Sequence, residues 1–326
     1  MAFANSSYTD ILATTIESRT GTVADNVRDS NALLTVLNKR GRIRPWSGGS
    51  TILQELSFQD NGTAQYYSGS EAVNVNPSDV ISASQFPIKQ ACCAVTITGL
   101  EQLQNSSEEQ VIDLLDARLD VAEASLENLI SAGLYSDGTG SNGKQITGLQ
   151  AAIVATPTSG IYGGIDKGTW TFWRNQSYTF ATDLGASATA STIQQGMDGL
   201  YAACSRGRDT TKLIVFDNFL WSMYMASLQN LSRVEMNSEL ASLGFQTVKF
   251  IGADVVLDGG IDGNCPAHIG YFINPSYLFY RPHSQRNFAP IGGERMSTNQ
   301  DATVQLLGWA GNLTASGLKF QGYLHA

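Results

Sequence analysis

The longest helical pattern in the chain spans residues 106–133, which read SSEEQVIDLLDARLDVAEASLENLISAG. Ser106 and Glu109 have the spacing of a capping box, and Gly133 is typical of a helix end. Between them, apolar residues recur at helical spacing, which predicts one helix over 106–132, about 40 Å long. Its predicted apolar stripe consists of Val111, Ile112, Leu115, Leu119, Ala122, Leu126, Leu129 and Ile130.

The same helix carries most of the negative charge of the chain. Residues 101–137 contain nine acidic residues and a single basic residue, Arg118, while the whole chain has a net charge of -9. Carboxylates spaced alternately four and three residues apart predict a continuous acidic face opposite the apolar stripe. Its members are Glu109, Asp113, Asp116, Asp120, Glu123 and Glu127. Such a face is either an ordinary solvated surface or one that repels a polyanion or accepts a basic partner.

Two short helices are predicted before this element, over 9–19 and 26–39, and Gly41 ends the second. A basic cluster follows, made of Lys39, Arg40, Arg42 and Arg44. These side chains either complement the dipole of the preceding helix or belong to an arm that docks on an acidic neighbouring subunit.

Residues 46–98 alternate like strands, with stretches at 51–58, 80–84 and 91–98. Asp60-Asn61-Gly62 is a hairpin signal, and Tyr66, Tyr67, Val73 and Val75 continue the pattern. Large apolar residues are few, so we expect a long two-sided hairpin that protrudes from the body. An isolated hairpin is marginally stable in water, which suggests that it lies on another subunit.

The remaining chain predicts an α+β fold without a βαβ repeat. Helices are expected over 190–205, with Thr192 and Gln195 as a capping box, and over 218–228. Strands are expected over 211–216, 248–257 (with a central turn or bulge), 268–273, 277–280, 303–307 and 318–324.

Composition limits the class of protein. The chain has 326 residues, of which 42% are hydrophobic and 15% charged, a combination typical of neither disordered chains nor coiled coils. Its acidity argues against nonspecific nucleic-acid binding. The N-terminus lacks the features of a signal peptide, and no run of about 18 apolar residues occurs. The four cysteines are therefore expected to be buried, reduced thiols: Cys92, Cys93, Cys204 and Cys265.

No catalytic, cofactor or metal site is predicted. Residues 138–144 resemble a glycine-rich phosphate loop, but they follow a helix rather than a strand, and Gln145 occupies the position that requires Ser or Thr. The three histidines, His268, His283 and His325, lack any metal-ligand spacing.

Several short stretches share a family likeness when taken in order: LYSDGTG (134–140) and ITGL (146–149) after the long helix, WTFWRNQ (170–176), then QDA (300–302) and WAGNLT (309–314). Together with the order of predicted elements, the whole chain resembles tailed-bacteriophage major capsid proteins of the Hong Kong 97-type fold. The resemblance implies an N-terminal arm (1–44), an extended β-hairpin called the E-loop (45–88), a peripheral domain (89–147 and 286–326) with a spine helix at about 106–132, and an axial domain (148–285).

The resemblance also implies a function. The protein would be a non-enzymatic virion component, assembled in the bacterial cytoplasm as hexamers and pentamers into an icosahedral head around double-stranded DNA that it does not bind specifically. The implied partners are further copies of the chain, a separate scaffolding protein (because the arm begins close to Met1), a portal and a decoration protein. The absence of Lys from 45–88 argues against a lysine crosslink of the E-loop.

Three alternatives stay open. An encapsulin-type cargo compartment resembles the same fold. A hydrolytic enzyme with a pocket in 148–285 has no motif in its favour, and a β-rich adhesin is disfavoured by the missing secretion signal.

Overall fold

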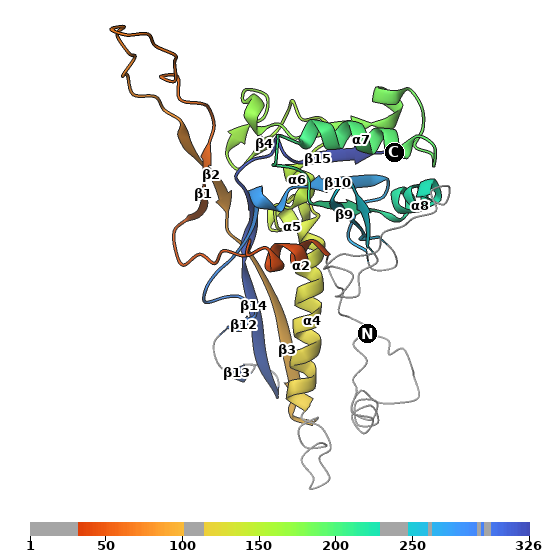
Figure 1. Ribbon diagram of the computed structural model, residues 1–326. Coiled ribbons are helices and arrows are strands. Elements are labelled where there is room, and N and C mark those ends of the chain that lie inside the picture. The colour runs from red at the N-terminus through yellow and green to blue at the C-terminus, as the bar shows by residue number, and fades with distance from the viewer. Residues whose placement is uncertain (1–31, 101–113, 229–246, 260–262, 292–294, 297–300) are drawn as a thin grey trace.

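The computed structural model describes residues 32–100, 114–228, 247–259, 263–291, 295–296 and 301–326. Figure 1 shows an elongated part in which long strands lie beside a long helix, a broader body with a second sheet, and a hairpin that projects away from both. The predicted helix over 9–19, the capping box at Ser106 and the start of the long helix lie outside the described residues.

Strand β14 (Ala302–Ala315) is the centre of a five-stranded sheet. It pairs antiparallel with β3 (Lys89–Thr98) on one side. On the other side it pairs with β11 (Leu278–Pro282), β12 (Ala289–Pro290) and β13 (Arg295–Met296). The prediction that 91–98 belongs to the protruding hairpin was therefore wrong, because β3 lies in this sheet.

Helix α4 (Leu114–Leu134) runs beside β3 (Figure 1). It extends past Gly133, where a Cβ would come within 3.0 Å of the Ile146 side chain, so glycine permits the returning chain to pack closely. Ala122, Leu126 and Ile130 are buried as predicted, but Leu129 is 56% exposed.

A second, six-stranded sheet has the order β6-β15-β10-β7-β9-β8. Its strands are β6 (Gln176–Thr179), β7 (Leu213–Phe216), β8 (Thr247–Phe250), β9 (Ala253–Leu257), β10 (Ile269–Ile273) and β15 (Gly322–His325). Helices α7 (Ile193–Cys204) and α8 (Asn218–Leu228) pack with the side of β7 that carries Ile214 and Phe216, and Leu213 and Val215 belong to the core shared with the five-stranded sheet. Burial of β7 on both sides explains its uninterrupted apolar sequence.

One local prediction in this sheet is confirmed and one needs correction. The central turn predicted within 248–257 is present at Ile251 and Gly252, which both adopt positive φ, 45° and 82°, so that β8 and β9 form a hairpin with a two-residue turn. Thr192 precedes α7, but it is not a capping-box residue: its hydroxyl accepts a hydrogen bond from the Thr189 N–H.

The hairpin consists of β1 (Thr51–Ser57) and β2 (Ile81–Pro87), paired antiparallel. Residues 58–80 form no strand, so the prediction that Tyr66, Tyr67, Val73 and Val75 continue the strands was wrong. The Asn61-Gly62 turn closes locally, with the Ala64 N–H donating to the Asn61 carbonyl, and does not join two strands.

Shorter elements connect these parts. Helix α2 (Ala32–Lys39) buries Leu33 and Leu37 and is followed by Gly41, with φ of 62°, as expected for a helix end. The others are α5 (Gly140–Gly143), α6 (Leu149–Ala152), β4 (Ile161–Tyr162), β5 (Ile165–Asp166), the 3₁₀ helices η1 (Thr171–Trp173) and η4 (Pro275–Tyr277), and the π-helix η2 (Phe180–Leu184).

Candidate interaction surfaces

The acidic residues of the long helix are only partly described. Glu109 and Asp113 lie outside the described residues, and Asp116 and Asp120 lie on α4 without described side chains. Glu123 and Glu127 are half-buried. Burial first, and the nearby Glu127 carboxylate to a lesser extent, raise the pKa of Tyr280 on β11.

In the C-terminal half of α4, therefore, Glu123 and Glu127 do not lie opposite the buried stripe, as the predicted acidic face requires. Ala124 and Ser131 are buried as well, so the buried sector is wider than the predicted stripe and surrounds Glu123 and Glu127. The exposed sector carries Val121, Leu129 and Ala132 instead. The helix packs against β3 and β14, and its Leu126 and Ile130 belong to the same core as Tyr280 of β11.

The basic cluster is divided between two environments. Lys39 and Arg40 are exposed at the end of α2. Arg42 and Arg44 lie over the Phe279 ring of the same chain, with guanidinium carbons 5.5 and 4.6 Å from its centroid. The Arg44 N–H also donates to the Tyr280 carbonyl, at 2.9 Å, so this segment is fixed to β11.

Aromatic side chains hold the base of the hairpin against the body. Phe58 contacts Trp170 and Phe172, with ring centroids 5.8 and 6.0 Å apart, and Phe86 contacts Tyr162 at 5.1 Å. The buried Gln54 accepts a hydrogen bond from Arg281 at 3.2 Å. The base of the hairpin is thus a fixed part of the subunit.

Beyond this base the hairpin is open to solvent. Tyr66, Tyr67, Val73 and Val75 are all exposed, and residues 45–88 contain four acidic residues and no basic one. Exposed aromatic and branched side chains on one projecting element are typical of a protein-interaction surface.

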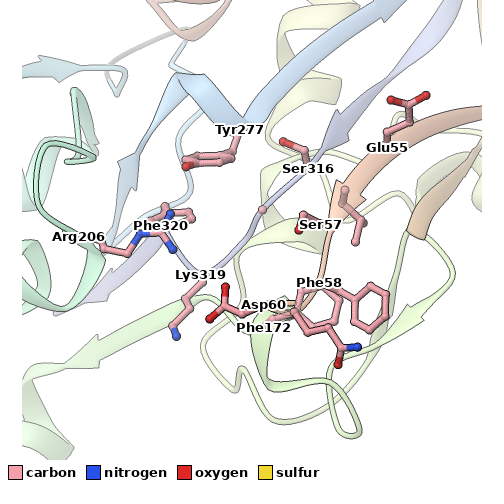
Figure 2. A pocket seen from close by; sticks show the side chains of 13 residues that line it. Glu55, Ser57, Phe58, Asp60, Phe172, Arg206, Tyr277, Ser316, Lys319 and Phe320 are labelled. Atoms are coloured by element: carbon pink, nitrogen blue, oxygen red, sulfur yellow. The ribbon is translucent and has the colours of Figure 1, made fainter. Parts of the chain in front are cut away.

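A groove of about 610 Å³ opens between the hairpin base and the loop that leads into β15. Figure 2 shows Glu55, Ser57 and Phe58 along one wall and Arg206, Tyr277 and Phe320 along the other. The Tyr277 and Phe320 rings are stacked, 4.4 Å apart with planes 13° apart, and the Arg206 guanidinium carbon lies 4.8 Å from the Phe320 centroid.

The far wall of this groove is rigidly built. Asp209 accepts hydrogen bonds from the Tyr277 hydroxyl and from the Asn274 amide. Burial first, and then the bond to Asp209, raise the pKa of Tyr277 to about 12, so the hydroxyl stays protonated and donates at neutral pH. Sequence reasoning missed this groove because its residues come from five separate segments and share no local motif.

The side chains with catalytic potential are placed in structural roles. Lys167 is buried, which lowers its pKa to about 8, and its amine donates to the Ala151 and Ala152 carbonyls at 3.2 and 2.8 Å. Cys204 is buried, which raises its pKa to about 12 and disfavours the reactive thiolate. Cys265 is buried too, but Cys92 is exposed and Cys93 half-buried, so the prediction of four buried thiols was wrong for β3.

A metal site, and a phosphate site in the glycine-rich turn, find no support in the described residues. No group of three or more His, Cys, Asp or Glu side chains within them is arranged to hold a metal ion. In the glycine-rich turn, Ser141 and Asn142 adopt positive φ, and the Thr139 N–H donates to the Asp137 carboxylate at 2.9 Å. That N–H is engaged by a negative side chain, which disfavours a bound phosphate.

Comparison with known proteins gives a likeness of fold. No protein-family model matches the chain, and no curated protein matches it. The chain is similar to a solved structure of the cyanophage A-1(L) capsid, with a TM-score of 0.69, 16% identity, and coverage of 93% of this chain and 94% of that one.

Two further structures share the fold at lower similarity. The capsid of cyanophage P-SCSP1u has a TM-score of 0.57 with 10% identity, covering 99% of this chain and 96% of that one. A SrpI encapsulin of Synechococcus elongatus PCC 7942 has a TM-score of 0.52 with 8% identity, covering 98% and 95%. The chain has the fold of phage capsid shell proteins.

Proposed function

We propose that this protein is the major capsid protein of a tailed bacteriophage. In this proposal, copies of the chain associate as hexamers and pentamers into an icosahedral head that encloses double-stranded DNA. The single observation that carries the proposal is the match in fold, over nearly the whole chain, to the cyanophage A-1(L) capsid. The projecting hairpin with exposed apolar side chains agrees with it, because such a surface requires a partner.

The parts of the subunit receive their proposed roles by position. Residues 1–44 are the N-terminal arm and 45–88 the E-loop. Residues 89–147 and 286–326, with α4 as spine helix, form the peripheral domain, and 148–285 the axial domain. A five-stranded sheet with α4 and a six-stranded sheet with α7 and α8 support two such domains, although β11 pairs with β14 of the first sheet and β15 belongs to the second. Arg42 and Arg44 have fixed positions on Phe279, so the exposed Arg40 is the member of the basic cluster that we propose for contact with a neighbouring subunit.

We further propose a virion location after assembly in the bacterial cytoplasm, with a scaffolding protein, a portal and a decoration protein as partners. None of the helices in the described part of the chain combines the length and apolar character that a membrane crossing requires. The role is structural rather than enzymatic, in keeping with the engaged positions of Lys167 and Cys204.

Electron microscopy of the purified protein tests the proposal. We expect closed shells or capsomer rings, either alone or after co-expression with a scaffolding protein. A particle that is monomeric or dimeric under all these conditions would contradict it.

An encapsulin-type compartment is the second candidate, because an encapsulin shares the fold. The higher TM-score of the phage capsid, 0.69 against 0.52, favours the phage reading. Adjacent genes for a portal and a terminase would support a phage head, whereas an adjacent ferritin-like or peroxidase cargo gene would support the compartment.

Charge reversal on α4 tests the proposal that its acidic face lies inside the head. Replacing Asp113, Asp116, Asp120 and Glu123 by Lys should make nucleic acid copurify with shells, because each added cation can neutralise a phosphate. The measurement is the ratio of absorbance at the nucleic-acid and protein maxima, in low and high salt. Glu123 is half-buried, so the variant that keeps Glu123 serves as the control for folding. An unchanged ratio in both variants would exclude an inward-facing acidic surface.

A further inference from the structure

Three arginine side chains gather on one face of β11 and of the segment beside it. The segment that follows α2 runs parallel to β11. The Tyr280 N–H donates to the Arg42 carbonyl at 3.1 Å, and the Arg44 N–H donates to the Tyr280 carbonyl at 2.9 Å. Side chains alternate between the two faces of paired strands, so both arginines share a face with Phe279 and Arg281.

The positive charges on this face lie close together. The guanidinium carbons of Arg42 and Arg44 lie 5.5 and 4.6 Å from the Phe279 centroid, so they are within about 10 Å of each other, which is one Debye length at 0.1 M salt. Burial first, and then the positive charge of Arg44, lower the pKa of Arg281. The three guanidinium groups therefore repel one another, and salt does not fully screen the repulsion.

No acidic side chain of the described chain neutralises this arginine cluster. Arg42, Arg44 and Arg281 form no ion pair with any described residue. The Arg281 guanidinium donates to the Gln54 side-chain oxygen at 3.2 Å, but that acceptor is neutral. The adjacent Glu55 points to the other face of β1 and lines the groove instead.

The cluster also lacks hydrogen-bond acceptors. The Nε atoms of Arg42 and Arg281 are buried and have no partner among the described residues. A half-buried cation normally requires both a counter-charge and acceptors for its N–H groups. Because Arg44 is exposed, an acceptor can reach the cluster from solvent.

A bound oxyanion would supply the missing charge and the missing acceptors. Guanidinium groups present planar pairs of N–H donors that match the oxygen pairs of carboxylates and phosphates. A carboxylate has a single charge and two oxygens, which suits one guanidinium. A phosphate group carries up to two charges and has more oxygens, so it fits a cluster of three arginines better.

We propose that Arg42, Arg44 and Arg281 form a phosphate-binding site in the corner between β11 and the base of the hairpin. Gln54 fixes the direction of the Arg281 guanidinium, and the Phe279 ring supports the other two. The phosphate group comes either from free orthophosphate or from a nucleic-acid backbone, and the contacts at the site are the same. All of these residues belong to one subunit, so the site does not depend on the proposed self-assembly.

Binding of orthophosphate to the full-length protein, measured by titration calorimetry at constant ionic strength, tests the site. The double variant Arg42→Gln, Arg44→Gln should bind at least about 10-fold more weakly than wild type, because two charge-assisted contacts are lost. Arg208→Gln with Lys249→Gln, two exposed residues on the part of the chain that contains the six-stranded sheet, is the control of equal charge change and should bind like wild type. If the double variant has a lower thermal midpoint, the exposed single variant Arg44→Gln decides the question.

A short DNA duplex distinguishes the two sources of phosphate. If the site takes backbone phosphates, the double variant should bind the duplex at least about 10-fold more weakly than wild type at low salt, and with a smaller dependence on salt. If the site takes free phosphate, the variant should lose affinity for orthophosphate alone. Equal affinities of wild type and variant for both probes, with equal thermal midpoints, would overturn the proposal and leave the shell function standing.

Discussion

Replacing residues 59–79 by Asn-Gly should give a subunit that folds normally and no longer forms shells. Phe58 and Val80 are a hydrogen-bonded pair, at 3.1 Å, which is the position where a two-residue turn closes an antiparallel hairpin. The shortened hairpin keeps Phe58 and its contacts with Trp170 and Phe172, so its base stays fixed. In our proposal, the removed segment contacts a neighbouring subunit. It contributes no buried side chain to the core of its own subunit.

The measurements for this prediction separate folding from assembly. The thermal midpoint of the purified subunit should change by no more than about 2 °C, because no buried apolar side chain is lost. Size-exclusion chromatography and electron microscopy should show subunits or small oligomers only. A full-length variant with Tyr66, Tyr67, Val73 and Val75 replaced by Ser is the matched control. It should reduce assembly through the lost apolar contacts alone, and shells of normal size from the shortened variant would refute a role of the hairpin in assembly.

The elements that could be predicted from sequence are those whose signal is local. Helix α8 has the predicted bounds. The described ends of α4, α7 and β7 differ from their predicted ends by a few residues. Helical spacing marks the helices and a short apolar run marks the strand, so each could be recognised locally. The acidic face of α4 could not be placed in this way. A prediction from helical periodicity assumes that a helix buries a single stripe of side chains. In the structure, neighbouring elements bury a wider sector of α4, which includes Ala124 and Ser131.

Strand β14 shows where local reasoning fails. Its predicted end, at residue 307, precedes Gly308 and Gly311, which look like breaks in a strand. In the structure both are required for close packing: a Cβ on Gly308 would lie 2.4 Å from the Ile291 side chain, and one on Gly311 would lie 2.5 Å from the Arg281 carbonyl oxygen. Ile291 and Arg281 are distant from these glycines in sequence. The close contacts that require glycine could therefore not be predicted from the residues around 308 and 311.

The same argument applies to the groove and to the hairpin base. Phe58 meets Trp170 and Phe172 more than a hundred residues away, and Arg206 meets Phe320 in the same manner. The scarcity of large apolar residues in 46–98 predicted a projecting hairpin, but only the resemblance to capsid proteins gave it the bounds 45–88. The stretches that carried the resemblance include two fully engaged asparagines, Asn175 and Asn312, whose roles are architectural.

Asn312 joins three parts of the subunit through one buried amide. Its side chain is fully buried on β14. Its carbonyl oxygen accepts hydrogen bonds from the Thr147 and Leu313 N–H groups at 3.0 and 2.9 Å, and its amide donates to the Pro87 carbonyl at 2.9 Å. It thereby ties the end of β2 and the loop after α4 to the central strand.

Asn312→Leu should destabilise the subunit by about 2 kcal/mol or more, because it leaves the partly buried Thr147 N–H and Pro87 carbonyl without this hydrogen-bond partner. Leu is close to Asn in size, so the loss measures unsatisfied polar groups rather than a cavity. We expect a thermal midpoint lower by about 3 °C or more. The same substitution at the exposed Asn287 is the control and should leave the midpoint unchanged. Equal thermal midpoints for the two variants would contradict this role of the Asn312 amide. The packing of the hairpin and of the loop after α4 against β14 would then be sufficient to hold them.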